Sequence, residues 1–387
     1  MKIIDKILTI IGYVIFIVPY CVLGGYVVIS VERIMSKNDT GYILLLIASF
    51  LSAAVFWFLH IIIHEGGHLI GGLMSGWKFL SFRVGKLTIV SQDGKLKWKK
   101  TMVMGTGGQC LMVPPDCDYE KCPFFLYLFS GGFANFLISG IAVIVGIFTG
   151  GIAQVFLNIF AIMGIGVGLT NLFPAKIGGM MNDGYQIFVE FPRNSEVRKY
   201  MCCLMIVNAI FTEQDSVKAL PEDVRNIILD LDGNDLSSVF VVNLLLFKNV
   251  ILYEKCRYKE ARGIFQKIID APNVLPVFKN EAKCERLYYE IMGKCNEDKV
   301  EELYDKDLKK YIEATAVYPS RKRLMYAYYL ICKNDEEMAE KEYQALLKIV
   351  KTHPSKAESA VELKEAERIR AHYECNNWNN KETKCRG

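Results

Sequence analysis

Two histidines and a glutamate stand together in the sequence His64-Glu65-Gly66-Gly67-His68. Residues four positions apart lie on one face of a helix, so the two imidazoles can bind a single metal ion. Glu65 is next to the first of them and can reach water at the same ion. A bound Zn²⁺ lowers the pKa of water towards about 7 and polarises a carbonyl group, as peptide-bond hydrolysis requires. The motif therefore predicts a protease site that uses one zinc ion.

The motif lies in a long apolar segment. From Gly41 to Trp77 the only acidic, basic or histidine residues are His60, His64, Glu65 and His68. Ionisable groups at bilayer depth cost roughly 2.5 to 3.5 kcal/mol each and are usually functional. We therefore favour a metal site over the alternative, a polar cluster whose members satisfy their hydrogen-bonding groups by contacts with one another. His60 falls one helical turn before His64, and we expect it to support the site rather than to bind the metal.

A catalytic zinc site needs a third protein ligand and an open position. The candidate is Asp183, in the stretch Asn182-Asp183-Gly184. This stretch follows the last apolar segment of the chain, so it returns to the same side of the membrane as His64. We therefore expect His64, His68 and Asp183 to converge on one ion.

Two further stretches of the chain resemble a known family. Asn171–Pro174, followed by Asp183-Gly184, resembles the second signature of the site-2 protease family of intramembrane zinc metalloproteases. Gly131–Asn135 is similar to that family's Gly-x-x-x-Asn element. The resemblance covers only residues 41–186, and the chain departs from the family in the long connection before Asp183, which contains Gly178-Gly179.

The resemblance implies a role for each of these residues. The zinc ligands would be His64, His68 and Asp183, Glu65 would be the general base and acid, and Asn135 and Asn171 would hold the substrate backbone or the developing oxyanion. A carboxylate partly desolvated beside a metal can exchange protons near neutral pH, and buried amides offer donors where negative charge develops. The alternative for both asparagines is interhelical hydrogen bonding, which is common in membranes.

Long apolar runs predict four transmembrane helices. The first two runs are Ile7–Val31 and Gly41–Ile70. Between Lys121 and Lys176 no residue is charged, and this stretch is about twice as long as one crossing needs. It must turn back on itself, and Thr149-Gly150-Gly151 is the expected turn.

The orientation of these helices follows from the basic residues of the short loops. The segment 78–100 holds seven lysines and arginines against one acid, whereas the loop 32–40 holds two bases and two acids. Basic loops stay on the cytosolic side. We therefore predict a multi-pass protein of the cell membrane with both termini, and the metal-binding end of the second helix, on the cytosolic side.

The second half of the chain has a different character. Charged residues are frequent from Arg193 onward, and no later segment is long and apolar enough to span. We divide the chain into a transmembrane zinc metalloprotease domain, 1–190, and a cytosolic helical domain, 191–387. Apolar periodicity in the latter predicts helices near 236–254 and 258–270, then pairs near 276–294 with 299–314 and 319–333 with 335–351, and a last helix near 356–374. These units of roughly 35 to 45 residues are in the range of tetratricopeptide (TPR) repeats, although an irregular helical bundle is the alternative.

A small β-hairpin is predicted in the sequence between His68 and Asp183. Residues 79–100 alternate apolar and polar on either side of Asp93-Gly94, the turn that two-residue hairpins prefer. In the family that the chain resembles, a hairpin or loop here can align the substrate as an added strand. The alternative is a surface hairpin whose lysines contact anionic headgroups.

Composition excludes some classes of protein. The twelve cysteines do not indicate a disulfide framework, because those from Cys256 to Cys385 show no paired spacing, which suits a reducing cytosol. Cys117 and Cys122 could form a second metal site or a redox pair, but we expect them to be loop thiols. The formal net charge is only +4, and we expect no nucleic-acid partner.

The fold class predicted from these features is an α-helical polytopic membrane protein with a small β-hairpin after the zinc helix and a C-terminal all-α, TPR-like soluble domain. The expected function is intramembrane cleavage of membrane-spanning or membrane-associated peptides near the cytosolic face. The expected partners are a membrane-protein or peptide substrate, the lipid bilayer, and a protein bound by the helical domain. The main alternative is a non-proteolytic membrane-anchored scaffold, and a transporter is a weaker one because no internal repeat is visible.

Overall fold

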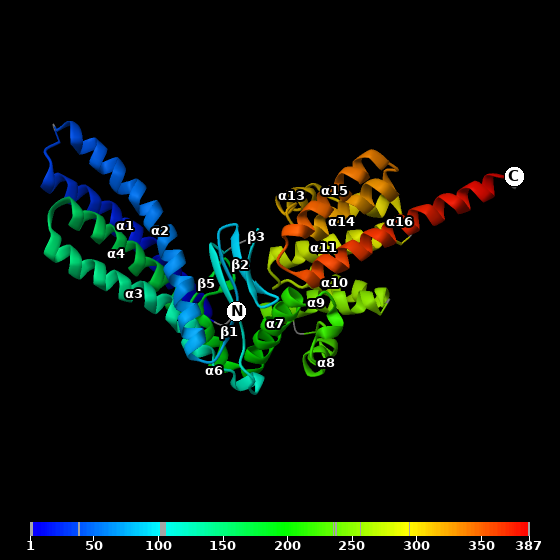
Figure 1. The fold of residues 1–387 in the computed structure, drawn as a ribbon, viewed down its shortest axis with the longest axis horizontal. Helices are drawn as coiled ribbons and strands as arrows, with labels where there is room; N and C mark the ends of the chain where they lie inside the picture. The colour runs from blue at the N-terminus through cyan, green and yellow to red at the C-terminus, as the bar shows by residue number, and fades with distance from the viewer. Residues whose placement is uncertain are drawn as a thin grey trace. The chain divides into compact units, whose positions relative to one another are not determined.

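The computed structural model describes residues 3–37, 39–100, 106–234, 236, 238–255, 257–293 and 295–385. It is mainly helical, with a few short strands (Figure 1). Contacts divide the chain into two compact units, residues 1–85 with 104–199 and residues 86–103 with 200–387. We call them the first and the second unit.

Four long helices form most of the first unit (Figure 1). They are α1 (Ile3–Ile34), α2 (Thr40–Met74), α3 (Phe124–Thr149) and α4 (Gly151–Leu172). Each is long and apolar enough to cross a membrane, and their positions confirm the four helices predicted from the apolar runs. Gly150 has a φ of 67°, a conformation that favours glycine, and it makes the expected turn between the last two helices.

The helices α2 and α3 approach each other closely through small residues. A Cβ atom on Gly67 would lie 2.3 Å from the carbonyl oxygen of Ser130, and one on Gly71 would lie 2.5 Å from that of Leu126. Without a hydrophobic driving force between helices in lipid, such close backbone packing is a main source of their association. Gly67 and Gly71 therefore bring α3 against the face of α2 that carries His64 and His68.

Short elements complete the first unit at the ends of the long helices. The strands β1 and β4 are antiparallel, with Phe82 opposite Cys110. The elements are β1 (Lys78–Val84), β4 (Gly108–Val113), η1 (Tyr119–Lys121), β5 (Lys176–Ile177), β6 (Met180–Met181), α5 (Asp183–Tyr185), the π-helical turn η2 (Gln186–Glu190) and α6 (Phe191–Arg193).

The predicted hairpin is present and belongs to the second unit. The strands β2 (Leu87–Gln92) and β3 (Lys95–Lys100) pair in antiparallel register, with Gln92 opposite Lys95. Asp93 and Gly94 have φ values of 57° and 69°, as the expected two-residue turn requires.

Polar contacts fasten this hairpin to helices of the same unit. The buried Gln92 amide donates hydrogen bonds to the carbonyl oxygens of Thr212, at 2.8 Å, and Pro354, at 3.4 Å. The Asp93 carboxylate forms ion pairs with Lys356, at 2.6 Å, and Lys97, at 2.7 Å. The hydrogen bond from Lys356, supported by that from Lys97, lowers the pKa of Asp93 to about 2.

The rest of the second unit is helical. A single buried apolar core runs from Val241 to Ile369, and the helices predicted from periodicity are present. One of them, expected over 299–314, is split because Asp305 accepts a hydrogen bond from the Leu308 backbone and starts a new helix. The elements are α7 (Ser195–Glu213), η3 (Val217–Ala219), α8 (Glu222–Asp230), α9 (Val239–Glu254), α10 (Tyr258–Asp270), α11 (Pro276–Ile291), α12 (Glu297–Leu303), α13 (Lys306–Ala314), α14 (Pro319–Ala327), the π-helical turn η4 (Tyr328–Cys332), α15 (Glu336–Thr352) and α16 (Lys356–Cys385).

The role of Gln92 in holding the hairpin can be tested by the substitution Gln92→Ala. Loss of two hydrogen bonds to otherwise buried carbonyls costs about 1 kcal/mol or more, so the amides of β2 and β3 should exchange with solvent about five- to tenfold faster. Hydrogen–deuterium exchange measures this directly. The neighbouring Ser91→Ala is the control and should exchange as the wild type does; equal exchange in both variants would contradict the proposed anchor.

Candidate metal centre

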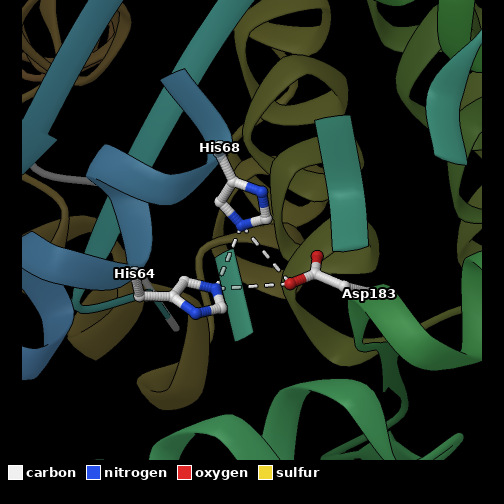
Figure 2. Close-up of side chains that lie close together, drawn as sticks. All are labelled: His64, His68 and Asp183. Carbon is white, nitrogen blue, oxygen red and sulfur yellow. Dashed lines mark hydrogen bonds and ion pairs between the residues drawn. The ribbon is translucent and has the colours of Figure 1, made fainter. Parts of the chain in front are cut away.

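Three side chains from distant parts of the sequence converge in the first unit, as Figure 2 shows. Nε2 of His64 lies 3.0 Å from Nε2 of His68. Oδ2 of Asp183 lies 3.3 Å from the first of these atoms and 3.4 Å from the second. The structure thus brings together the three residues that the sequence suggested as metal ligands.

The triangle formed by these atoms has the size of one face of a zinc site. Bonds of about 2.0 to 2.2 Å at tetrahedral angles place neighbouring ligand atoms roughly 3.3 to 3.6 Å apart. The observed separations of 3.0 to 3.4 Å are close to that range. Three protein ligands leave the fourth position of a tetrahedral ion for water or substrate, as in catalytic zinc sites.

A chain of hydrogen bonds orients the ring of His64. The buried Asn135 amide donates to the His60 carbonyl oxygen at 2.9 Å, so its nitrogen faces His60 and its oxygen faces His64. That oxygen accepts a hydrogen bond from Nδ1 of His64 at 3.1 Å. Nε2 of His64 is therefore left without a proton in the neutral ring, and its lone pair points to His68 and Asp183.

His60 supports this chain from the side away from the metal ligands. Its Nε2 donates to the Phe160 carbonyl oxygen at 2.9 Å, and its Nδ1 lies 3.1 Å from the amide nitrogen of Asn135. Both ring nitrogens are thus used in hydrogen bonds. His60 lies outside the convergent group, in line with the supporting role expected for it.

The ring of His68 is held by a backbone carbonyl. Nδ1 of His68 donates to the carbonyl oxygen of Tyr127 at 2.7 Å, which turns Nε2 towards the centre of the triangle. The Tyr127 hydroxyl in turn donates to the carbonyl oxygen of Cys110 at 2.6 Å, so β4 supports the residue that orients His68. Partners of this kind fix the tautomer and orientation of metal-binding histidines.

Asp183 is placed by its two neighbours in the sequence. Asn182 accepts hydrogen bonds from the backbone of Ala175 and Tyr185 through Oδ1 and donates to the carbonyl oxygens of Thr170 and Phe173. It thereby fixes the start of α5 against the end of α4. Gly184 lies so close to α4 that a Cβ atom would be 2.1 Å from the carbonyl oxygen of Leu172. The extra length of the connection before Asp183 forms the small hairpin β5–β6.

The electrostatics of the triangle favour a cation at its centre. Burial disfavours ionisation of Asp183, but its contacts with His68 and His64 outweigh burial and lower its pKa below the usual range. Within the described residues its buried Oδ2 accepts no well-directed hydrogen bond, although both Nε2 atoms are close to it. Three electron-rich atoms held together in this way repel one another unless a proton or a metal ion lies between them. The donor set, two imidazoles and a carboxylate, suits Zn²⁺.

Glu65 lies beside the triangle rather than in it. Its side chain is buried, and its carboxylate accepts a hydrogen bond from the backbone of Cys110. Gly108 makes room for it, because a Cβ atom there would lie 2.7 Å from Oε1 of Glu65. The carboxylate is therefore held between α2 and β4, next to His64 and His68.

The two asparagines suggested by the resemblance differ in their surroundings. The amide of Asn135 is occupied by His64 and His60, which favours the alternative of interhelical hydrogen bonding for this residue. Asn171 donates to the carbonyl oxygen of Val167, one turn back in its own helix, and the structure shows no bond from it to the metal-binding residues among those described. The roles of Tyr127 and Asn182 were not predicted, because a backbone carbonyl that orients a histidine and an amide that holds a turn have no recognisable sequence motif.

Comparison with known proteins adds no family assignment. No protein-family model matches the chain, and no curated protein and no solved structure matches it either. Within the described residues, His64, His68 and Asp183 are the one group of three or more histidines, cysteines or acids that could hold a metal ion. Cys117 and Cys122 are not part of such a group.

Zinc content distinguishes ligands from supporting residues. Asp183→Ala should lose bound zinc, whereas Asn135→Ala should retain it with an affinity about 10- to 100-fold lower, since the His64 ring loses its orienting partner. Competition with a chelator, followed by metal analysis of the purified protein, measures both effects. Asn171→Ala is the matched control in the neighbouring helix. Zinc bound by Asp183→Ala at the affinity of the wild type would exclude the proposed site.

The space over the imidazoles gives a second test. A Cβ atom on Gly131 would lie 2.5 Å from Nε2 of His68 and 2.9 Å from Cε1 of His64, so Gly131→Ala should displace the rings and weaken zinc binding about tenfold or more. Gly140, in the same helix, has no atom within 4 Å of its would-be Cβ, and Gly140→Ala should bind zinc normally. Equal zinc affinity of the two alanine variants in the same titration would show that the rings lie elsewhere.

Proposed function

We propose that this protein is an intramembrane zinc endopeptidase that cleaves membrane-spanning or membrane-associated peptides. The observation that supports this most strongly is the convergence of His64, His68 and Asp183, with Glu65 buried beside them. This constellation lies near the end of an apolar helix that is long enough to cross a membrane. We also propose that the chain is related to the site-2 protease family.

Each residue of the site has a part in the proposed reaction. The zinc ion would be held by the two histidines and Asp183, and it would acidify water and polarise the scissile carbonyl. Glu65 would take the proton from the attacking water and pass it to the nitrogen of the leaving amine. Asn135, His60 and Tyr127 would keep the two imidazoles in place throughout.

The proposed orientation puts this chemistry near the cytosolic face. The basic residues of segment 78–100 follow α2 directly, and basic loops remain on the cytosolic side. His64 and His68 are in the last part of α2, so water would reach them from the cytosol. Both termini would then be cytosolic, and the second unit would be soluble.

The second unit would recruit the substrate or a partner. Its helices α10 with α11 and α14 with α15 pack in sequence-adjacent pairs, a feature shared with TPR-like repeats. Stacked helical pairs present extended surfaces for protein recognition. The structure offers no second constellation of metal ligands in this unit among the described residues, so we assign it binding rather than catalysis.

The proposed chemistry is tested by Glu65→Gln. The amide keeps the shape of the side chain but cannot accept the proton, so zinc should remain bound while cleavage falls by about 100-fold or more. Membrane proteomes of cells carrying the wild type or the variant should differ in peptides that accumulate only in the variant. Glu32→Gln, an exposed glutamate of α1, is the control. Undiminished cleavage by Glu65→Gln would rule out the mechanism, and loss of zinc would make Glu65 a ligand.

A further inference from the structure

The second unit contains a cavity that the proposed protease chemistry does not use. Its volume is ≈ 330 Å³, and residues of α9, α10, α11, α14 and α16 line it. One part of the wall is apolar and includes Phe247, Val250, Val277 and Val361. A cavity of this size, at the small end of ligand pockets, holds one or two side chains rather than a folded domain.

The other part of the wall is acidic. Its five glutamates are Glu281, Glu285, Glu358, Glu362 and Glu365, and the only basic residue among the described lining residues is Arg323. Arg323 is already engaged, because its guanidinium forms ion pairs with Glu285 at 2.7 Å and with Glu362 at 2.5 Å. The same guanidinium lies 3.8 Å from the ring centroid of Tyr288.

The glutamates around the cavity outnumber the arginines that pair with them, so the cavity has an excess of negative charge. Arg321 pairs with Glu281, Arg368 pairs with Glu365, and Arg323 is shared by two glutamates. Three arginines thus face five carboxylates in the ion pairs of the described residues, and Glu358 lies 3.4 Å from the imidazole of His353. The side chain of Glu358 is 40% exposed and lines the same cavity as the apolar part of the wall, so a cation can reach it from solvent.

The burial of the Glu362 carboxylate also indicates that the cavity favours a cation. Burial raises the pKa of Glu362 to about 7, with Arg323 opposing the rise and Glu285 adding to it. A cation that enters the cavity would supply the missing countercharge and favour the ionised carboxylate. The wall therefore fits a positive group better than a neutral or a negative one.

From this geometry we infer that the cavity is a docking site for a basic and apolar peptide segment of a partner protein. A lysine or arginine side chain enters between Glu358 and Glu362, and a neighbouring apolar side chain packs on Phe247 and Val277. The apolar wall distinguishes such a segment from a small free cation, which would leave that wall exposed to water. This inference goes beyond the proposed protease function and does not depend on it, because binding needs no zinc.

The experiment uses the full-length protein in phosphatidylcholine nanodiscs, whose lipid carries no net charge. The probe is a fluorescein-labelled peptide pool, Gly-Z-Lys-Z-Lys-Z-Gly, in which Z is an equal mixture of Phe, Leu and Val. Fluorescence anisotropy should show saturable binding that weakens with added salt, and no binding of the pool with Glu in place of Lys. Glu358→Gln and Glu362→Gln should each weaken binding at least about fivefold.

Matched variants separate this site from general acidity. Glu337 is an exposed glutamate in the first turn of α15, the helix position that Glu358 has in α16, and Glu337→Gln should leave affinity unchanged. Phe247→Ala should weaken binding of the peptide pool but not of spermine. Failure of the basic pool to bind, equal binding of the acidic pool, or unchanged affinity in the Glu358 and Glu362 variants would overturn the inference. Spermine that binds as tightly as the pool would make this a small-cation site instead.

Discussion

The first unit depends on one constraint: three electron-rich atoms are held 3.0 to 3.4 Å apart within an apolar helical bundle. Mutual repulsion would separate these atoms if their side chains were free to rotate. They are not free, because oxygen atoms of Asn135 and Tyr127 accept hydrogen bonds from Nδ1 of His64 and Nδ1 of His68, which turns each Nε2 lone pair towards the triangle. The polar network around the site thus holds an arrangement that a proton or a metal ion between the three atoms makes favourable.

Small residues make this arrangement possible. Gly67 lets α3 approach α2, Gly131 leaves space for the two rings, and Gly184 lets Asp183 reach them from the end of α4. Each contact is between elements far apart in the sequence, and any side chain at these positions would occupy space that backbone or imidazole already fills. The glycines that let these elements approach one another therefore also set the space left for the triangle of His64, His68 and Asp183.

Much of this architecture could be predicted from local patterns. Charge-free runs gave the four long helices, the Asp93-Gly94 turn gave the hairpin, and helical spacing put His64 and His68 on one face, because each depends on neighbouring residues alone. The use of the Asn135 amide and the Tyr127 carbonyl could not be predicted, since both depend on how α3 packs on α2. The split at Asp305 was missed because a capping residue outweighed the continuing apolar pattern. The grouping of segment 86–103 with the second unit rests on partners more than a hundred residues away.

The hairpin also has a consequence for the order of events during synthesis. Gln92 donates a hydrogen bond to the carbonyl oxygen of Pro354. Pro354 is synthesised 262 residues after Gln92. At typical rates of translation this is a wait of roughly 10 to 50 seconds, during which β2 and β3 lack their final partners. An unprotected strand invites pairing with other chains, and charged side chains are the usual defence. β3 carries four such charges, on Lys95, Lys97, Lys99 and Lys100.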